Sequence, residues 1–148
     1  MNRHDLNLAF YRKLTGLAIA NMIDVRPDEI EEPASLLNSQ SWRRGVVMLN
    51  EPEPIAWGDG VYSRIHGLYQ IDIYVPRAAA SAFKVASEYS DAHVAHFFPA
   101  NGRGITVTEN QTSAHIVRRP SQRHLGREGA YLRDVVEVDF YLDVPAEA

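Results

Sequence analysis

Two histidines in the second half of the chain have the spacing of metal ligands on a helix. His93 and His96 are three residues apart, which places them about 60° apart around a helix axis, so both could reach one ion. A zinc site needs at least a third ligand, and Asp91 belongs to a different part of that helix surface. We therefore expect His93 to flank a packed face, His96 to be solvated, and no metal or cofactor to bind.

Other arrangements that could support catalysis are equally weak. Asp72 and Glu137 could share the polar face of neighbouring strands and act as an acid–base pair, although carboxylates on a solvated sheet face are ordinary. No serine lies in a Gly-x-Ser-x-Gly turn. The glycine-rich Asn101-Gly-Arg-Gly104 precedes an expected strand and lacks the Lys-Ser/Thr ending of a phosphate-binding loop. The sequence predicts no catalytic residue, and therefore a protein that is not an enzyme.

Basic residues gather in one stretch of an otherwise acidic chain. They could contact phosphate or an acidic protein surface, or they could belong to a solvated loop. Arg64 and His66, on the polar face of a long predicted strand, could extend such a surface. The candidate interface residues are Arg64, His66, Arg118, Arg119, Arg123, His124 and Arg127.

Composition limits the class of protein. The chain has 148 residues, 45% hydrophobic and 23% charged, which favours one globular domain over residues 1–148. It has no cysteine, so disulfide frameworks and cysteine-based zinc sites are excluded. A net charge of −4 argues against a protein whose main task is to grip nucleic acid. Charged residues among the first twenty argue against a signal peptide, and no apolar run suits a membrane span, so we expect a soluble intracellular domain.

The clearest structural pattern is a long alternation from Val61 to Val75. Odd positions are largely apolar, whereas even positions include Arg64, His66 and Asp72. Side chains alternate across a strand, so the pattern predicts one long strand with a buried face and a polar face, as antiparallel sheets allow. Pro76 should end it.

The remaining segments complete an element order. Apolar spacing predicts helices at Leu6–Ile19 and Ala79–Phe97, and strands near Gly45–Asn50 and Tyr131–Leu142. Ile105–Val107 and Ala114–Val117 predict one interrupted strand or two short ones. Turn and loop residues mark the connections, which are Val25–Ser41 with a possible helical turn at Ala34–Leu37, Asn50–Gly60, and Ser121–Gly129.

These elements predict an α+β fold in the order α-β-β-α-β-β. A mostly antiparallel four-stranded sheet should carry both helices on one face. The long strand should pair with the Gly45–Asn50 region and with one other strand. The covered face should bear Ile65, Ile71, Ile73, Val136, Val138 and Phe140.

Several segments together resemble a known family. They are Val46-Val-Met-Leu-Asn-Glu-Pro-Glu-Pro-Ile55, Arg64-Ile-His-Gly-Leu-Tyr-Gln-Ile-Asp-Ile-Tyr-Val-Pro76, His96-Phe-Phe98 and Gly129-Ala-Tyr-Leu-Arg-Asp-Val-Val-Glu-Val-Asp-Phe140. With the N-terminal amphipathic helix, they are similar to the short tail terminator proteins of long-tailed bacteriophages and prophages. The resemblance covers most of the chain from about Gly45, and its sharpest part is Gly67, the apolar alternation and Pro76.

The resemblance implies a structural virion protein that forms a ring, usually a hexamer, on the end of a completed tail tube. The ring would stop tube polymerisation and join the tail to the head. Its implied partners are further copies of itself, the tail tube protein and the head–tail connector protein, with DNA passing through the pore and no membrane involved. It would be assembled in the host cytoplasm.

Two other functions stay open. One is a head–tail connector or another tail-completion protein. The other is a small intracellular α+β binding or enzyme domain. An enzyme would need His93 and His96, or Asp72 and Glu137, to converge on a pocket.

Overall fold

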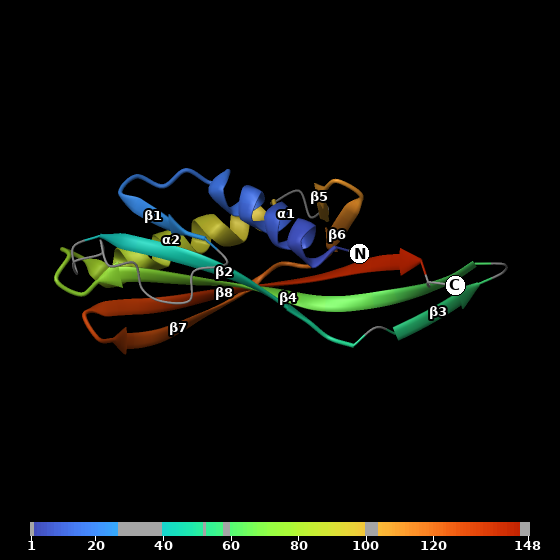
Figure 1. Ribbon diagram of the computed structural model, residues 1–148. Coiled ribbons are helices and arrows are strands. Elements are labelled where there is room, and N and C mark those ends of the chain that lie inside the picture. The colour runs from blue at the N-terminus through green and yellow to red at the C-terminus, as the bar shows by residue number, and fades with distance from the viewer. Residues whose placement is uncertain (1, 27–39, 52, 58–59, 100–103, 146–148) are drawn as a thin grey trace.

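A single curled sheet organises the chain (Figure 1). The computed structural model describes residues 2–26, 40–51, 53–57, 60–99 and 104–145. Two helices and eight strands lie within these ranges. In chain order they are α1 (Arg3–Thr15), β1 (Met22–Val25), β2 (Ser41–Leu49), β3 (Glu53–Trp57), β4 (Gly60–Pro76), α2 (Ala82–Phe97), β5 (Ile105–Glu109), β6 (Thr112–Ile116), β7 (Ser121–Glu128) and β8 (Tyr131–Pro145).

The sheet is built on the antiparallel pair of β4 and β8. Their register runs without interruption from the Tyr62–Pro145 pair to the Pro76–Tyr131 pair. The strand order is β1-β2-β4-β8-β6-β5, with β3 on β4 and β7 on β8 off this path. Among the described strands, only β1 and β2 pair in parallel. The prediction of one long strand ended by Pro76 is confirmed, as are its two pairings.

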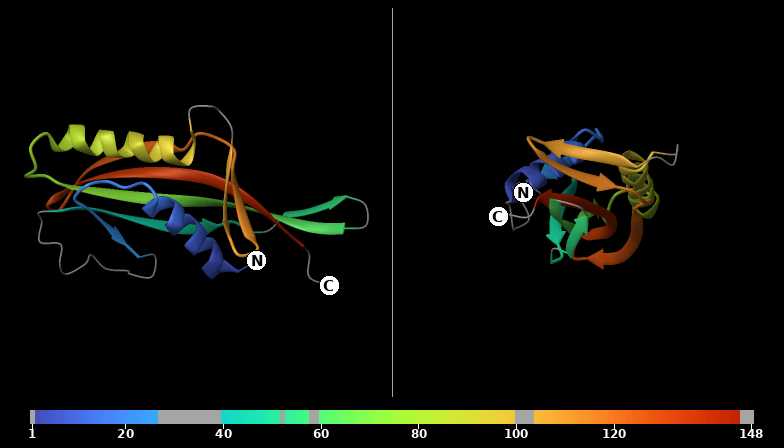
Figure 2. Two further views of the ribbon diagram at one scale, coloured as in Figure 1. Left: turned by 90° about the horizontal axis from the view of Figure 1, so that it is seen from above. Right: turned by 90° about the vertical axis from the view of Figure 1, so that its right-hand side faces the viewer.

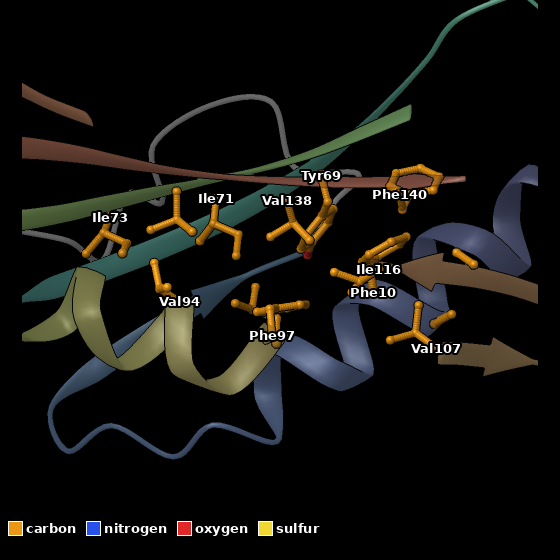
Figure 3. Close-up of a cluster of buried hydrophobic side chains, with 14 of the residues drawn as sticks. Phe10, Tyr69, Ile71, Ile73, Val94, Phe97, Val107, Ile116, Val138 and Phe140 are labelled. Atoms are coloured by element: carbon orange, nitrogen blue, oxygen red, sulfur yellow. The ribbon is translucent and has the colours of Figure 1, made fainter. Parts of the chain in front are cut away.

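Both helices and the β5–β6 hairpin cover the inner face of the sheet (Figure 2). The six residues predicted for the covered face are all buried in one core cluster. Phe10 of α1 stacks on Tyr69 with ring centroids 4.6 Å apart and tilts against Phe140 at 4.7 Å. Phe97 of α2 and Ile116 of β6 reach the same core (Figure 3). The core is therefore closed from three sides.

The helices differ slightly from their predicted bounds. The first helix begins earlier than Leu6 because the Asn2 side chain accepts hydrogen bonds from the backbone N–H groups of His4 and Asp5, at 2.9 and 3.4 Å. It ends at Thr15, so Leu17 lies beyond it. No helix of the described ranges has the length and apolar character needed to cross a membrane.

The predicted four-stranded sheet in the order α-β-β-α-β-β is wrong. The described chain has eight strands in a mixed sheet, in the order α-β-β-β-β-α-β-β-β-β. Ser121–Gly129, expected to be a loop, contains β7, whose side chains are exposed at every position except Gly126. Alternating apolar residues mark a strand only when one of its faces is buried. β7 is an edge strand without a buried face, so its sequence lacks this pattern.

Two other predicted connections also contain strand residues. The Asn50–Gly60 turn contains β3, where Pro54 is tolerated because β3 pairs on one side only among the described strands. The Val25–Ser41 connection begins and ends in strand residues, which form part of the parallel β1–β2 pair. The helical turn expected at Ala34–Leu37 lies outside the described residues.

A close approach of two strands explains Gly67. A Cβ at this position of β4 would lie 2.4 Å from Cζ of Phe140 and 2.9 Å from the backbone oxygen of Met48. The ring of Phe140 therefore occupies the space that a side chain would need, and the neighbouring backbone limits any shift. Gly67 is required for the packing of Phe140 into the core.

Gly67→Ala should lower the free energy of unfolding by about 3 kcal/mol, because one methyl group must displace both the Phe140 ring and backbone. Urea denaturation followed by circular dichroism measures the change. Val46→Ala, at an exposed position of β2, is the control and should cost less than about 1 kcal/mol. Equal losses in the two variants would contradict the steric explanation.

Candidate interaction surface

A buried arginine joins four parts of the inner layer. Arg43 of β2 is 1% exposed, and its Nε donates to Asp24 Oδ1 of β1 at 2.5 Å. Its Nη2 donates to the backbone oxygen of Leu17 at 2.6 Å, and its Nη1 lies 2.9 Å from His93 Nε2 of α2. A buried charge is tolerated when it is paired and hydrogen-bonded in this way. Arg43 thus connects α2 and the segment after α1 to the edge of the sheet.

The same contacts explain the state of His93. Arg43 can only donate, so His93 Nε2 accepts, and His93 Nδ1 donates to the backbone oxygen of Tyr89 at 2.6 Å. Burial lowers the pKa of His93 to about 4; the bond to Tyr89 opposes this shift and the charge of Arg43 adds to it. His93 is therefore a neutral structural residue at physiological pH.

His93 and His96 do not converge on a metal ion. His96 Nε2 lies 2.6 Å from the backbone oxygen of Lys13, whereas His93 is directed at Arg43. Two expectations are corrected: His93 is fully buried rather than flanking the packed face, and His96 is half-buried against α1 rather than solvated. Across the described ranges, no group of three potential ligands could hold a metal.

The two carboxylates considered for acid–base work occupy separate ion pairs. Asp72 is buried and accepts from Arg133 Nη2 at 2.7 Å, whereas Glu137 pairs with Arg123. In the strand register Glu137 lies opposite Gln70 rather than Asp72. Each carboxylate is thus neutralised by its own arginine, and the pair does not form a shared site.

A third group contains the residue types of a hydrolytic triad in the wrong order. Ser90 Oγ donates to Asp134 Oδ2 at 2.7 Å, and His124 Nδ1 bonds the other carboxylate oxygen. In a catalytic triad the histidine lies between serine and carboxylate, where it can take the serine proton. Here Asp134 lies in the middle and Ser90 is 1% exposed. The group attaches β7 to α2 and leaves no activated nucleophile.

The outer face of the sheet carries a row of ion pairs along β8. Arg64 of β4 pairs with Asp143 at 2.8 Å, Arg118 pairs with Asp139 at 2.7 Å, and Arg123 of β7 pairs with Glu137. The hydrogen bond from Arg64 lowers the pKa of Asp143. Three of the predicted interface residues therefore have their charge balanced within the chain. Because these arginine charges are neutralised by carboxylates, the outer face has little attraction for polyanions.

The predicted basic cluster is divided between two places. Arg64, His66 and Arg118 lie on the outer face, where His66 and Arg118 line a depression of about 510 Å³ beside Met48 and Leu68. Near the other end of β8, Arg127 lines a different cavity.

Two of the remaining candidates lie on β7, and the third just precedes it. Arg123 bonds Glu137 on the outer face, and His124 lies against Phe83 of α2 with ring centroids 5.0 Å apart. The side chain of Arg119 is exposed and has no hydrogen bond or ion pair with the described residues. Strand geometry separates residues that a flexible loop could have brought together.

An apolar strand edge was not predicted as part of the surface. Val46 and Met48 of β2 are 37% and 43% exposed on the outer face. The Asn50 N–H donates to the His66 oxygen at 2.9 Å, and hydrogen-bonded pairs alternate in antiparallel strands. By that alternation the backbone groups of Gly45, Val47 and Leu49 point away from β4. Among the described strands β1 covers β2 only over Ser41–Arg44, and the Val25–Arg44 pair of this parallel ladder engages the Gly45 N–H. The outward backbone groups of Val47 and Leu49 therefore have no strand partner among the described strands. We call Val46–Leu49 the β2 edge.

The sequence contained a signal for this edge. Val46-Val-Met-Leu49 has four apolar residues in succession, so both faces of its strand are apolar. One face packs on the core through Val47 and Leu49, which leaves Val46 and Met48 exposed. Long apolar edges in soluble proteins mark sites of strand pairing or association.

Comparison with known proteins bears on the fold. No protein-family model matches the chain, and no curated protein matches it. A solved structure whose name states no function is similar over 100% of this chain and 98% of its own, with a TM-score of 0.59 and 18% sequence identity. At this identity the likeness shows a shared fold.

Stability should fall as the pH is lowered from 6.5 to 4. The unfolded chain protonates His93 near its ordinary pKa of about 6.5, whereas the folded chain resists protonation until about pH 4. This contribution is complete above pH 6.5 and is lost on the way to pH 4, amounting to about 3 kcal/mol at most. His96, whose pKa burial also lowers, adds a slope of the same sign.

His93→Gln tests this assignment, because its amide can still accept from Arg43 but does not titrate. Urea denaturation between pH 4 and 7.5 should give a smaller pH dependence for the variant than for the wild-type chain. Parallel curves for the two proteins would show that His93 is not the titrating group.

Proposed function

We propose that this chain is a tail terminator of a long-tailed bacteriophage or prophage. It forms a ring, of six copies, on the end of the completed tail tube, stops tube growth and provides the surface that joins the tail to the head. Its partners are further copies of itself, the tail tube protein and the head–tail connector protein. The protein acts in the virion and is assembled in the host cytoplasm, and its role needs no catalysis.

The observation that carries the proposal is the exposed apolar β2 edge. A ring of identical subunits uses a heterologous contact, in which two different surfaces of each subunit meet. The sheet supplies an edge on either side of the β4–β8 pair, with β2 on one side and β7 on the other. The β7 edge is charged and bulged between His124 and Gly126, a pattern that discourages indiscriminate pairing, whereas the β2 edge is apolar.

The polar groups also support this role. Arginines that could grip DNA are paired with carboxylates on the outer face, and the chain has a net charge of −4. A ring through which DNA passes need not hold it. His93, Asp72 and Ser90 make structural contacts with Arg43, Arg133 and Asp134, respectively.

Lysines on the β2 edge should prevent ring formation. In Val46→Lys/Met48→Lys both new side chains lie on exposed outer-face positions, so the subunit should fold while strand association fails. Sedimentation analysis should find the wild-type chain, of 16.6 kDa, as a ring of about 100 kDa and the variant as a monomer. Ala95→Lys, at an exposed position of α2, is the control and should keep the ring. A ring formed by the edge variant would exclude the β2 edge as the contact.

Deleting the gene tests the role in particles. Electron microscopy of the deletion strain should show tails of uncontrolled length that do not join heads, and the wild-type gene should restore normal particles. Arg119→Glu should impair the joining of tails to heads if the basic stretch meets a partner protein. This change breaks no ion pair among the described residues, whereas a change at Arg123 would break its pair with Glu137. Tails of normal length on filled heads in the deletion strain would disprove the proposed function.

A further inference from the structure

A cavity of about 570 Å³ opens at the end of the sheet where α2 begins. The β4–α2 turn and the β7–β8 turn lie together at this end (Figure 2). Its walls are apolar and include Ala79, Ala82, Phe83 and Leu132. Two arginines, Arg77 and Arg127, complete the lining. The cavity therefore combines an apolar wall with two positive charges.

The charges of these arginines are not balanced by carboxylates of the described chain. Arg77 Nη1 donates to the backbone oxygen of Gly129 at 2.9 Å, which is a neutral acceptor. The side chain of Arg127 has no hydrogen bond or ion pair with the described residues. By contrast, six arginines form salt bridges with Asp or Glu, namely Arg12, Arg43, Arg64, Arg118, Arg123 and Arg133. The difference indicates that Arg77 and Arg127 are available to an anion from outside.

The start of α2 adds to the positive potential at this place. Ser81 caps the helix with φ of 55° and makes no side-chain hydrogen bond to it, and the first turn contains no acidic residue. The first N–H groups of a helix attract negative charge when no internal cap occupies them. The two arginines remain the principal charges.

The apolar part of the cavity indicates what the anion is attached to. Phe83 is 59% exposed, the highest value among the large apolar side chains that are exposed in the described ranges. Leu132 is buried beside it. An exposed aromatic ring in a concave site can receive an apolar side chain, which a free inorganic anion would leave uncovered.

We propose that this cavity binds a short acidic segment of a partner protein. A carboxylate of that segment would lie between Arg77 and Arg127, and a neighbouring apolar side chain would cover Phe83. Guanidinium groups can bind carboxylates in a bidentate manner, which fixes the orientation of the segment. The inference does not depend on ring formation, because the cavity lies within one subunit.

A peptide fits these observations better than a nucleic acid. Nucleic acids bind through several phosphates at once, and beyond its two arginines this cavity is lined by alanine, phenylalanine and leucine. The chain as a whole is also acidic, which repels a polyanion more than a short segment with one or two carboxylates.

NMR titration of the full chain provides the test. The probe is the peptide Gly-Glu-Leu-Glu-Gly, and its matched control is Gly-Gln-Leu-Gln-Gly. We expect the acidic peptide to shift the amide signals of Ala82, Phe83 and Ala130 saturably, with affinity that falls as salt is added. The glutamine peptide should bind at least tenfold more weakly.

Variants identify the binding residues without loss of the fold. Arg127→Gln should weaken binding of the acidic peptide at least tenfold, because the charge-assisted bond to its carboxylate is lost. The fold should be kept, because the side chain of Arg127 makes no hydrogen bond or ion pair with the described residues. Arg119→Gln, an exposed arginine that does not line the cavity, should change the affinity less than twofold. The edge variant Val46→Lys/Met48→Lys should bind as the wild-type chain does, which separates this proposal from the ring.

Four results would overturn the proposal, three of them from the peptide titrations. These three are an absence of peptide-induced shifts in the folded wild-type chain, equal binding of the glutamine peptide, and unchanged binding of the acidic peptide to Arg127→Gln. Displacement of the acidic peptide by a single-stranded DNA oligonucleotide would identify a nucleic-acid site instead.

Discussion

The uninterrupted pairing of β4 with β8 is the constraint on which the rest of the structure depends. Because side chains alternate along both strands, one register decides the face of every residue from Tyr62 to Pro76. Ile65, Ile71 and Ile73 face the helices, whereas Arg64 and Asp72 face outward. A shift by one residue would bury the charged row and expose the core.

That register also separates two kinds of polar group. On the outer face, arginines meet carboxylates of β8 in partly exposed pairs, which contribute little to stability individually. On the inner side, Arg43 and Asp134 are buried and bond to residues of the helices and their connections. The buried groups are costly to leave unpaired, so they help to specify how α2 and the loop after α1 lie on the sheet. His93, Asp134 and Ser90, whose residue types could support catalysis, thus serve to position α2 on the sheet.

The surfaces left for partners lie where the sheet ends. The β2 edge has apolar side chains and backbone groups without a strand partner among the described strands, which suits association between subunits. The cavity bounded by Arg77 and Arg127 combines positive charge with an apolar wall, which suits a different kind of partner. An assembly protein of the proposed kind must hold copies of itself and also other proteins, so two chemically distinct surfaces are consistent with that role.

The sequence by itself determined those helices and strands in which apolar residues recur at a regular spacing because one face is buried. The strand from Val61 to Val75, both helices and their shared inner face follow from the spacing of apolar residues, because burial acts on each of them directly. Tertiary structure decided the rest. The strand β7 has almost no buried side chain, and Arg43 is buried only because His93, Asp24 and the Leu17 carbonyl meet it there. Strand pairing and buried contacts between residues far apart in the chain depend on how distant segments pack together. Local sequence patterns do not predict such packing.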